Sequence, residues 1–268
     1  MHTFICSDSI DGILTGVYQA FSSKLPHSQI RLSTREPDNY ELFTEYHTVA
    51  PDSCLAAKVV ESLKKRFGQE FYETIYEAAM SDSTSSAGAM DKAYAIYRTI
   101  YLAFIYKSGT KVLLALGEPC VYRVFELCRG TSREAMHLLG FTRFQELKNQ
   151  LLIARIHPKN HVLPILGEHF SNRLPEENFI IFDENRRLAV IHPCKKSFFI
   201  TDTTGLQSEL LEEFSTEEQK YQQLWLTFFE SVAIQSRCNK SLQSQLIPKR
   251  FQADAIEFTI SKSPQKTA

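Results

Sequence analysis

The first residues of the chain change from a strand pattern to a helix pattern. Residues 3–6 form a short apolar run, which is typical of a strand. The apolar residues that follow recur at helical spacing: Ile13, Leu14, Val17, Tyr18 and Phe21. In the polar turn between the two runs, Asp8 or Ser9 can cap the helix. The pattern predicts a βα unit with a helix over residues 10–21, and it favours capping over anion binding for the acidic turn.

A short strand is predicted at residues 30–33, and a strongly helical region follows it. One apolar face runs through this region: Leu55, Val59, Leu63, Phe71, Ile75 and Ala78. It predicts a helix over about residues 52–80. The polar residues 81–88 have almost nothing to bury and predict an exposed link. A second helix then runs to about Tyr106.

This second helix has a tyrosine stripe. Tyr94, Tyr97 and Tyr101 fall on one of its faces. Aromatic rings in such a row can stack on unpaired bases. A half-buried packing stripe is commoner, so we favour packing and keep base stacking as the alternative.

The middle of the chain predicts two shorter helices, over residues 119–127 and 132–139. Arg129-Gly130-Thr131 separates them, because glycine in a helix interior is unfavourable. Gly140 is expected to end the second helix, as glycine often does just after the last turn.

Strand patterns then replace the helical ones. Short runs rich in β-branched and aromatic residues occur at four places: residues 151–156, 178–183, 188–192 and 197–201. Turn-forming residues separate the last three runs, which predicts an antiparallel meander. Between the first two runs, Pro164 can open a short helix with His169 and Arg173 on one face.

A long helix is predicted after Ser215. Ser215 and Glu218 have the spacing of a capping box, in which each side chain bonds to the backbone amide of the other. A wide apolar stripe follows: Tyr221, Leu224, Trp225, Phe228 and Val232. We expect this stripe to pack on the sheet or on the other helices.

Together these elements predict an α+β fold. It consists of a helical N-terminal region with an initial βα unit, then a small antiparallel sheet packed by a long C-terminal helix. We expect a single domain over residues 1–258, with a helical subdomain at about 50–140 as a possibility within it. Residues 259–268 are predicted to form a frayed polar tail.

Composition narrows the class of protein. The 268 residues are 43% hydrophobic, enough to bury a sizeable core. No run is long and apolar enough for a membrane span, and no basic leader precedes an apolar run, so we expect a cytoplasmic protein. The six cysteines contain no Cys-x-x-Cys pair, which argues against a disulfide framework and against zinc or iron–sulfur sites. The net charge of -1 argues against a globally basic nucleic-acid binder, although a local basic surface can still hold phosphate.

Residues 155–173 place three histidines and two arginines beside an apolar strand, a density of titratable groups that a purely structural segment seldom needs. Several motifs there and elsewhere resemble a bacterial family of DNA repair or DNA metabolism proteins with a domain of unknown function, DUF4130. They are Asp8 and Gly12; Arg133-Glu134-x-x-His137-x-x-Gly140-Phe141-x-Arg143-Phe144; Arg155-Ile156-x-Pro158; His169-Phe170-x-x-Arg173; Ile180-Ile181-x-Asp183 with Arg186 or Arg187; Arg237-x-Asn239-x-x-Leu242-Gln243; and Pro248-x-Arg250. Two positions depart from the family pattern, Lys159 in place of an acid and Phe251 in place of tyrosine.

The resemblance implies a context more than a reaction. Family members are encoded beside a radical S-adenosylmethionine protein that modifies or repairs DNA, and related domains occur fused to uracil-DNA-glycosylase-like modules. This chain lacks the Cys-x-x-x-Cys-x-x-Cys triad of the radical enzyme. The resemblance therefore implies DNA and the radical S-adenosylmethionine protein as partners, and no membrane partner is expected.

The arginines of these motifs are the candidates for nucleic-acid binding: Arg133, Arg143, Arg155, Arg173, Arg237 and Arg250. Arginine favours bidentate contacts with phosphate. The alternative is that they form structural ion pairs with the nearby acids: Glu134, Glu146, Glu168, Asp183 and Glu257. The sequence favours neither of these two interpretations.

The candidates for catalysis are His169, Asp183 and His137. Imidazole titrates near neutrality and also ligates metals, so His161 and His169 with Asp183 or Glu134 could form an acid–base pair or a metal site. Glu134-x-x-His137 matches one half of a di-iron motif, but the chain has no second half. We therefore predict no metal and no cofactor, and the absence of a Gly-x-Ser-x-Gly elbow argues against a serine nucleophile.

Two functions are compatible with these residues and motifs. The first is a non-catalytic DNA-binding accessory that presents DNA to the radical S-adenosylmethionine partner. The alternative is a glycosylase-like or nuclease-like enzyme that acts on damaged DNA in a pocket enclosing His169, Asp183 and Arg143. We favour the accessory role.

Overall fold

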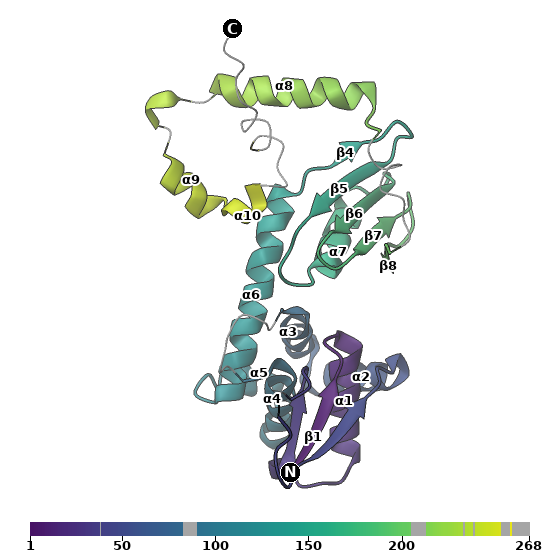
Figure 1. Cartoon of the computed structure of the whole chain (residues 1–268), viewed down its shortest axis with the longest axis vertical. Helices are drawn as coiled ribbons and strands as arrows, with labels where there is room; N and C mark the ends of the chain where they lie inside the picture. Colours follow the sequence, from purple (N-terminus) through teal and green to yellow (C-terminus); the bar gives the residue numbers. More distant parts are fainter. Residues whose placement is uncertain are drawn as a thin grey trace. The chain divides into compact units, whose positions relative to one another are not determined.

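The computed structural model describes residues 1–37, 39–82, 90–204, 213–232, 234–237, 239–252 and 258. They form a mixed α/β protein, 54% helical, with two sheets. The chain divides into two compact units, which we name the first unit (Met1–Ser132) and the second unit (Arg133–Ala268) (Figure 1). The predicted mixture of helices and strands is confirmed. The single domain over residues 1–258 stays a prediction, because a compact unit need not fold alone.

The first unit is built on a small parallel sheet. Its strands are β1 (His2–Cys6), β2 (Ile30–Ser33) and β3 (Glu45–Val49), in the spatial order β2-β1-β3. The predicted βα unit and the second strand are confirmed, but β3 is absent from the sequence-based prediction. Only Val49 of β3 is buried, so this segment lacks the apolar run that identifies β1.

Helices make up most of the rest of the first unit. They are α1 (Ile10–Ser22), the short 3₁₀ helix η1 (His27–Gln29), α2 (Ser53–Phe67), α3 (Gln69–Met80), α4 (Lys92–Tyr106) and α5 (Gly109–Leu113). The single helix predicted over residues 52–80 is therefore wrong. Gly68 separates α2 from α3 with a φ of 91°, a conformation that glycine adopts without steric cost. The apolar face continues across this break, with Leu63 and Phe71 both buried, which is why the pattern predicts one helix.

The acidic turn between β1 and α1 is structural. Ser9 is the cap of α1, because its Oγ accepts a hydrogen bond from the Gly12 amide at 3.0 Å. A side chain at Gly12 would lie 2.6 Å from the carbonyl oxygen of Ser7, so this close turn requires glycine. The Asp8 carboxylate pairs with the buried ammonium group of Lys92. The turn thus links the end of β1 to the start of α4.

The tyrosine stripe of α4 packs inside the first unit. Tyr97 is fully buried, and its Oη lies 2.5 Å from Nδ1 of His27. The ring of Tyr101 lies against the same imidazole, with 4.2 Å between the centroids, and Tyr94 is partly buried. The packing interpretation is confirmed, because the central ring of the stripe is not available to a base.

α6 (Pro119–Phe141) is one continuous helix. The break predicted at residues 129–131 is wrong, because these residues are helical. Gly130 is exposed there, and Thr131 donates its hydroxyl to the carbonyl oxygen of Leu127 at 3.2 Å. Gly140 also lies within the helix and does not end it. The boundary between the two units falls within α6.

The second unit contains a five-stranded sheet in the order β4-β5-β6-β7-β8. Its strands are β4 (Gln145–Glu146), β5 (Leu152–Ile156), β6 (Phe179–Asp183), β7 (Leu188–His192) and β8 (Phe199–Asp202). The meander of β6, β7 and β8 is confirmed. The sheet as a whole is mixed rather than antiparallel, because β5 pairs in parallel with β6. The predicted helix after Pro164 is α7 (Leu163–Arg173), which connects these two strands.

The predicted packing of the C-terminal helix is wrong. The helices of this region are α8 (Thr216–Val232), the 3₁₀ helix η4 (Gln235–Arg237), α9 (Lys240–Leu246) and α10 (Lys249–Gln252). The apolar stripe of α8 is exposed at every predicted position: Tyr221, Leu224, Trp225, Phe228 and Val232.

The start of α8 explains this exposure. The Ser215 amide donates to the carbonyl oxygen of Glu146, and the Glu146 amide donates to the Glu218 carboxylate, at 2.9 and 3.1 Å. α8 is thus tied to the edge strand β4 rather than laid over a face of the sheet. Only half of the capping box forms, the bond from the Glu218 amide to Ser215 Oγ. The predicted tail, residues 259–268, lies outside the described residues.

None of the helices in the described part of the chain combines the length and the apolar content that crossing a bilayer requires. The cytoplasmic location stays a prediction.

Candidate functional site

The buried carboxylate of Glu134 is the centre of the candidate site. Glu134 lies on α6 and is only 1% exposed. Its Oε1 accepts from the Lys159 amide at 2.9 Å and its Oε2 from the Asn160 amide at 2.7 Å. Nη1 of Arg250, on α10, lies 3.1 Å from the same Oε1. A charge can be buried when donors satisfy it in this way, and here those donors come from two distant segments.

The loop between β5 and α7, residues 157–162, supplies the two amides and is also held from another side. Asn185 Nδ2 and Arg186 Nη1 donate to the carbonyl oxygen of Pro158 at 2.9 and 3.1 Å. Arg186 Nη2 donates to the carbonyl oxygen of Lys159. Glu134 therefore binds the amides of the loop, while the β6–β7 turn binds its carbonyl groups. This double attachment fixes the backbone of the loop.

Asp183, a predicted catalytic residue, builds that turn. It ends β6 and is fully buried. Its Oδ1 accepts from the amides of Asn185 and Arg186 at 3.1 and 3.0 Å, and its Oδ2 lies 3.2 Å from Nη1 of Arg186. Burial raises the pKa of this carboxyl, although the neighbouring guanidinium acts in the opposite direction. The contacts give Asp183 a structural role, and its catalytic role stays a prediction.

His137, one turn after Glu134 on α6, faces aromatic rings. Its imidazole stacks on the ring of Phe251, with 5.3 Å between centroids and 24° between planes, and lies beside Phe141 at 6.1 Å. The guanidinium carbon of Arg250 lies 4.5 Å from the centre of the Phe251 ring. The Glu134-x-x-His137 motif thus separates its two functional groups: the carboxylate holds a loop and the imidazole packs in a small aromatic stack.

The remaining predicted residues lie in varied surroundings. Arg155 pairs with Glu184 at 3.0 Å, and Arg143 Nη1 donates to the carbonyl oxygen of Gly140 at 2.9 Å. His169 is half-buried on α7 with its ring edge-on to Phe170. The others are exposed: Arg133, Arg173 and Arg237. The contacts around Glu134 and Asp183 therefore unite only some of the predicted site residues.

The ion-pair interpretation is confirmed for Arg250, and phosphate binding by the arginines stays a prediction. Arg250 is paired with Glu134, as the ion-pair interpretation expects, yet its side chain remains 47% exposed. Around the fixed loop, cations lie on the contacting segments or next to them in sequence. We name this set the basic loop surface: Arg133, Arg155, Lys159, Arg186, Arg187, Lys249 and Arg250. Glu134 and Asp183 are buried, so among the described acids that pair with this set it is Glu184, the partner of Arg155, that is partly exposed.

Sequence reasoning missed several parts of this site. Asn185 holds the loop through its side chain, the Asn160 amide is one of the two that Glu134 binds, and Lys159 is an exposed cation of the loop. The signal for the turn is Asp183 at the end of a strand with Arg186 three residues later, which is typical of a side chain that accepts from amides two and three residues ahead. The role of Glu134 had no such local signal, because the amides it binds are more than twenty residues away in sequence.

Two cysteines and one group of potential metal ligands stand out in the described part of the chain. Burial raises the pKa of Cys6 and of Cys128 to about 12, so these thiols stay protonated at neutral pH. Among the described residues, the group of three potential metal ligands is His2, Glu45 and His47. It includes none of the histidines for which the sequence suggested a metal.

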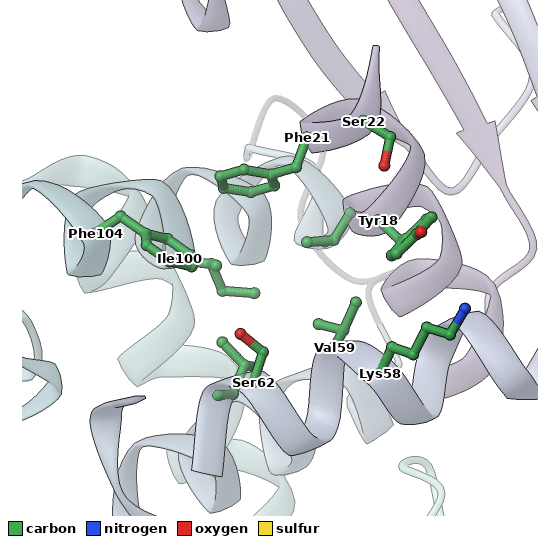
Figure 2. Close-up of a pocket in the computed structure, with 10 residues that line it drawn as sticks. Tyr18, Phe21, Ser22, Lys58, Val59, Ser62, Ile100 and Phe104 are labelled. Atoms are coloured by element: carbon green, nitrogen blue, oxygen red, sulfur yellow. The ribbon is translucent and has the colours of Figure 1, made fainter. Parts of the chain in front are cut away.

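The first unit contains an open pocket of about 250 Å³ between α1, α2 and α4. It is lined mainly by apolar side chains, and its polar groups come from Tyr18, Ser22, Lys58 and Ser62 (Figure 2). The Lys58 ammonium lies 5.9 Å from the centre of the Tyr18 ring. No residue predicted for catalysis or nucleic-acid binding lines this pocket.

Comparison with known proteins places most of the second unit, and the end of the first, in one family. The family model of DUF4130, a domain of unknown function, matches residues 90–257. This segment runs from α4 to α10 and contains the whole basic loop surface. Curated proteins give no match. Since the match covers more than half of the chain, this protein belongs to the DUF4130 family.

Proposed function

We propose that this protein binds DNA through the phosphate backbone and that the basic loop surface makes the contact. The observation that carries the proposal is the arrangement around Glu134. A buried carboxylate fixes the loop backbone through two amides and holds the partly exposed guanidinium of Arg250 at the loop. Cations are thus placed on a rigid support rather than on mobile side chains alone.

The chemistry of arginine supports this use. A guanidinium has five N–H donors, and the ion pair of Arg250 with Glu134 is made through one of its terminal nitrogens. Other donors of the group can meet phosphate oxygens, for which the planar fork of arginine is suited. Holding the side chain in advance lowers the entropy cost of binding. Contacts of this kind position DNA without reading its sequence.

The partner belongs to the same proposal. The resemblance to proteins encoded beside a radical S-adenosylmethionine protein supports an accessory role, in which this chain contributes affinity for DNA and the partner carries out the chemistry. The ionic character of the loop surface fits that role, because phosphate contacts leave the bases accessible to a second protein.

The alternative is an enzyme that acts on damaged DNA. The raised pKa of Asp183 favours it, since perturbed carboxyl groups are common at active sites. Against it, both oxygens of Asp183 accept bonds that build the β6–β7 turn. The accessory role therefore has the stronger support.

Binding to labelled single-stranded and double-stranded DNA, measured by fluorescence anisotropy over a salt series, tests the proposal. Replacing the exposed Lys159 and Lys249 by alanine is expected to weaken binding. The slope of log K against log salt should become less negative by about 0.9 for each duplex phosphate that the variant no longer neutralises. Lys195→Ala and Lys220→Ala are matched controls, because these exposed lysines pair with Glu176 and Glu217 rather than with groups of the loop.

The outcomes separate the two functions. Weaker binding in the loop variants alone supports the basic loop surface. Equal losses of affinity in the control variants, or no binding by the wild type, contradict it. Altered DNA in the wild-type reaction, abolished in Asp183→Asn or His169→Ala, favours the enzyme.

A further inference from the structure

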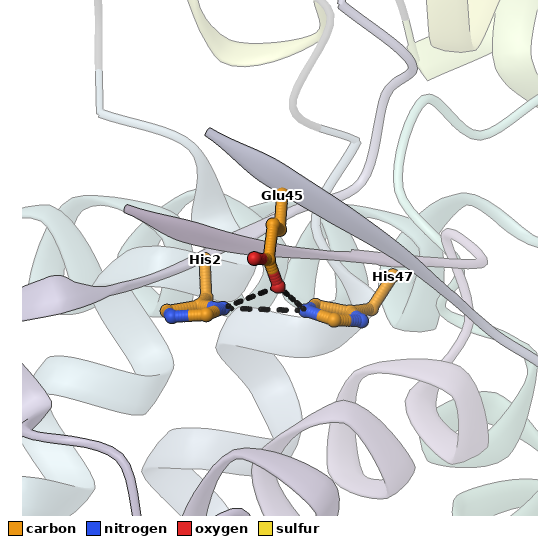
Figure 3. Close-up of side chains that lie close together, drawn as sticks. All are labelled: His2, Glu45 and His47. Carbon is orange, nitrogen blue, oxygen red and sulfur yellow. Dashed lines mark hydrogen bonds and ion pairs between the residues drawn. The ribbon is translucent and has the colours of Figure 1, made fainter. Parts of the chain in front are cut away.

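Two imidazoles and a carboxylate meet at the start of two strands in the first unit. His2 is on β1, and Glu45 and His47 are on β3. In the parallel register, His2 pairs with Glu45 and Phe4 pairs with His47. Because side chains alternate along a strand, these residues lie on one face of the sheet. Figure 3 shows the three polar side chains converging.

The distances between the donor atoms match those of a metal site. His2 Nδ1 lies 3.4 Å from His47 Nε2 and 3.4 Å from Glu45 Oε2, while His47 Nε2 and Glu45 Oε2 are 3.9 Å apart. A tetrahedral zinc ion with bonds near 2.0–2.1 Å holds its ligand atoms about 3.3 Å from one another. The triad therefore needs little movement to coordinate a cation.

We propose that His2, Glu45 and His47 bind a divalent transition-metal ion, with zinc as the representative ion. Two imidazole nitrogens and one carboxylate oxygen suit such ions, whereas calcium and magnesium prefer sites made of oxygen atoms. Three protein ligands leave a fourth position for water or another exchangeable ligand, as in zinc sites that are not purely structural.

The fold prepares this site before any ion binds. The strand register fixes the backbone of all three ligands, and the Glu45 amide donates to the carbonyl oxygen of Met1 at 2.9 Å. The ring of His47 lies against that of Phe4, with 5.0 Å between centroids and 28° between planes. His2 is the most buried ligand, and Glu45, 73% exposed, has room to turn toward an ion from solvent.

The simpler explanation is an ordinary ion pair. Two imidazole nitrogens that face each other at 3.4 Å cannot both present lone pairs without repulsion, so one must have a proton in the absence of a metal. A protonated imidazole beside the Glu45 carboxylate would satisfy the geometry as well. Metal titration distinguishes the two occupants, because the ion pair does not depend on any added cation.

The site is separate from the proposed DNA contact. All three ligands lie in the first unit and outside the family match over residues 90–257. Failure of one proposal therefore has no bearing on the other.

The test uses the full chain without an affinity tag, since a histidine tag would bind the same ions. After treatment with a chelator, isothermal titration calorimetry with zinc chloride is expected to show one ion per chain. His47→Ala and His2→Ala should each weaken zinc binding by about 10–100-fold or more. Losing a residue that merely hydrogen-bonds a metal ligand already costs about 10–100-fold in affinity. Glu45→Gln should also weaken it, by about 10-fold at the lower end of that range, because the amide keeps one oxygen.

Two controls match these variants. Glu41→Gln removes a nearby exposed carboxylate outside the triad, and His157→Ala removes an exposed histidine of the other unit. Both should bind zinc as the wild type does, and circular dichroism should show that every variant is folded. No binding by the wild type, or the same affinity in His47→Ala, overturns the proposal.

Cobalt provides a second measurement that identifies the ligand atoms. Coordination by nitrogen and oxygen is expected to give visible d–d absorption bands that disappear in His47→Ala. An intense near-ultraviolet band from sulfur-to-cobalt charge transfer would show binding by a thiol, such as the exposed Cys54, and would also overturn the assignment.

Discussion

Two clusters of charged and titratable side chains in this protein differ in how completely their atoms are satisfied. In the second unit, Glu134 and Asp183 are buried, and their oxygens accept bonds from backbone amides and arginines. In the first unit, Glu45 is mostly exposed and meets two imidazoles that face each other. The first arrangement stabilises a loop, and the second resembles a binding site. Burial and bond saturation, rather than residue type, separate the carboxylates that hold the loop from the one for which we propose a metal.

The largest expected effect tests this contrast directly. Glu134→Ala leaves two loop amides without an acceptor, one of them on the buried Asn160. The loss should cost about 2–5 kcal/mol of unfolding free energy, because each buried donor left unsatisfied costs about 1–3 kcal/mol. Glu45→Ala should change it by less than about 1 kcal/mol, as for an exposed pair.

Urea unfolding of both variants provides the comparison. Glu184→Ala is a further control within the second unit, because this carboxylate pairs with Arg155 but is partly exposed. A loss of stability in Glu184→Ala as large as that in Glu134→Ala would remove the special role of burial.

A smaller effect is expected at Asp183. Asp183→Ala removes the acceptor of two turn amides, which should cost about 1–3 kcal/mol. The pKa of this carboxyl is raised in the fold, so its contribution to stability is fully present below the ordinary value of 3.8 and is lost as pH rises through the raised value. The advantage of the wild type over the variant should therefore shrink with rising pH, by at most about 1.4 kcal/mol per pH unit.

Asp202 supplies a control of opposite sign. The hydroxyl and amide of Thr204 lower the pKa of this exposed carboxyl, so its contribution is present at neutral pH and is lost as pH falls. The advantage of the wild type over Asp202→Ala should shrink toward acid pH. The same pH trend in both variants would contradict the assignment for Asp183.

The sequence predicted well what depends on local patterns. The βα unit, the helix after Pro164 and the meander of β6 to β8 follow from periodicity and turn residues that lie next to one another in the chain. The break at Gly68 was hidden because the apolar face continues across it. β3 was missed because its polar residues, including Glu45 and His47, leave only Val49 buried.

The candidate sites were less accessible, because they depend on contacts between distant segments. The sequence suggests Glu134 as a partner for arginine or for a histidine, but its bonds to the loop amides require the fold. His2 lies more than forty residues before Glu45, and only the parallel register of β1 and β3 unites them. Motif spacing therefore identified the family and several of its residues, while the geometry of both sites comes from sheet pairing and helix position.

The smallest expected effect, that of Leu224→Ala on α8, extends the comparison from carboxylates to apolar side chains. Leu224 of α8 is 63% exposed, whereas Leu166 of α7 is fully buried. Leu166→Ala should cost about 2–5 kcal/mol, and Leu224→Ala should change stability by less than about 0.5 kcal/mol, because a surface substitution leaves no cavity. Urea unfolding of the two variants measures both. A cost at Leu224 as large as that at Leu166 would mean that the stripe of α8 is covered in solution, and the contrast between exposed and saturated groups would then hold only for the charged clusters.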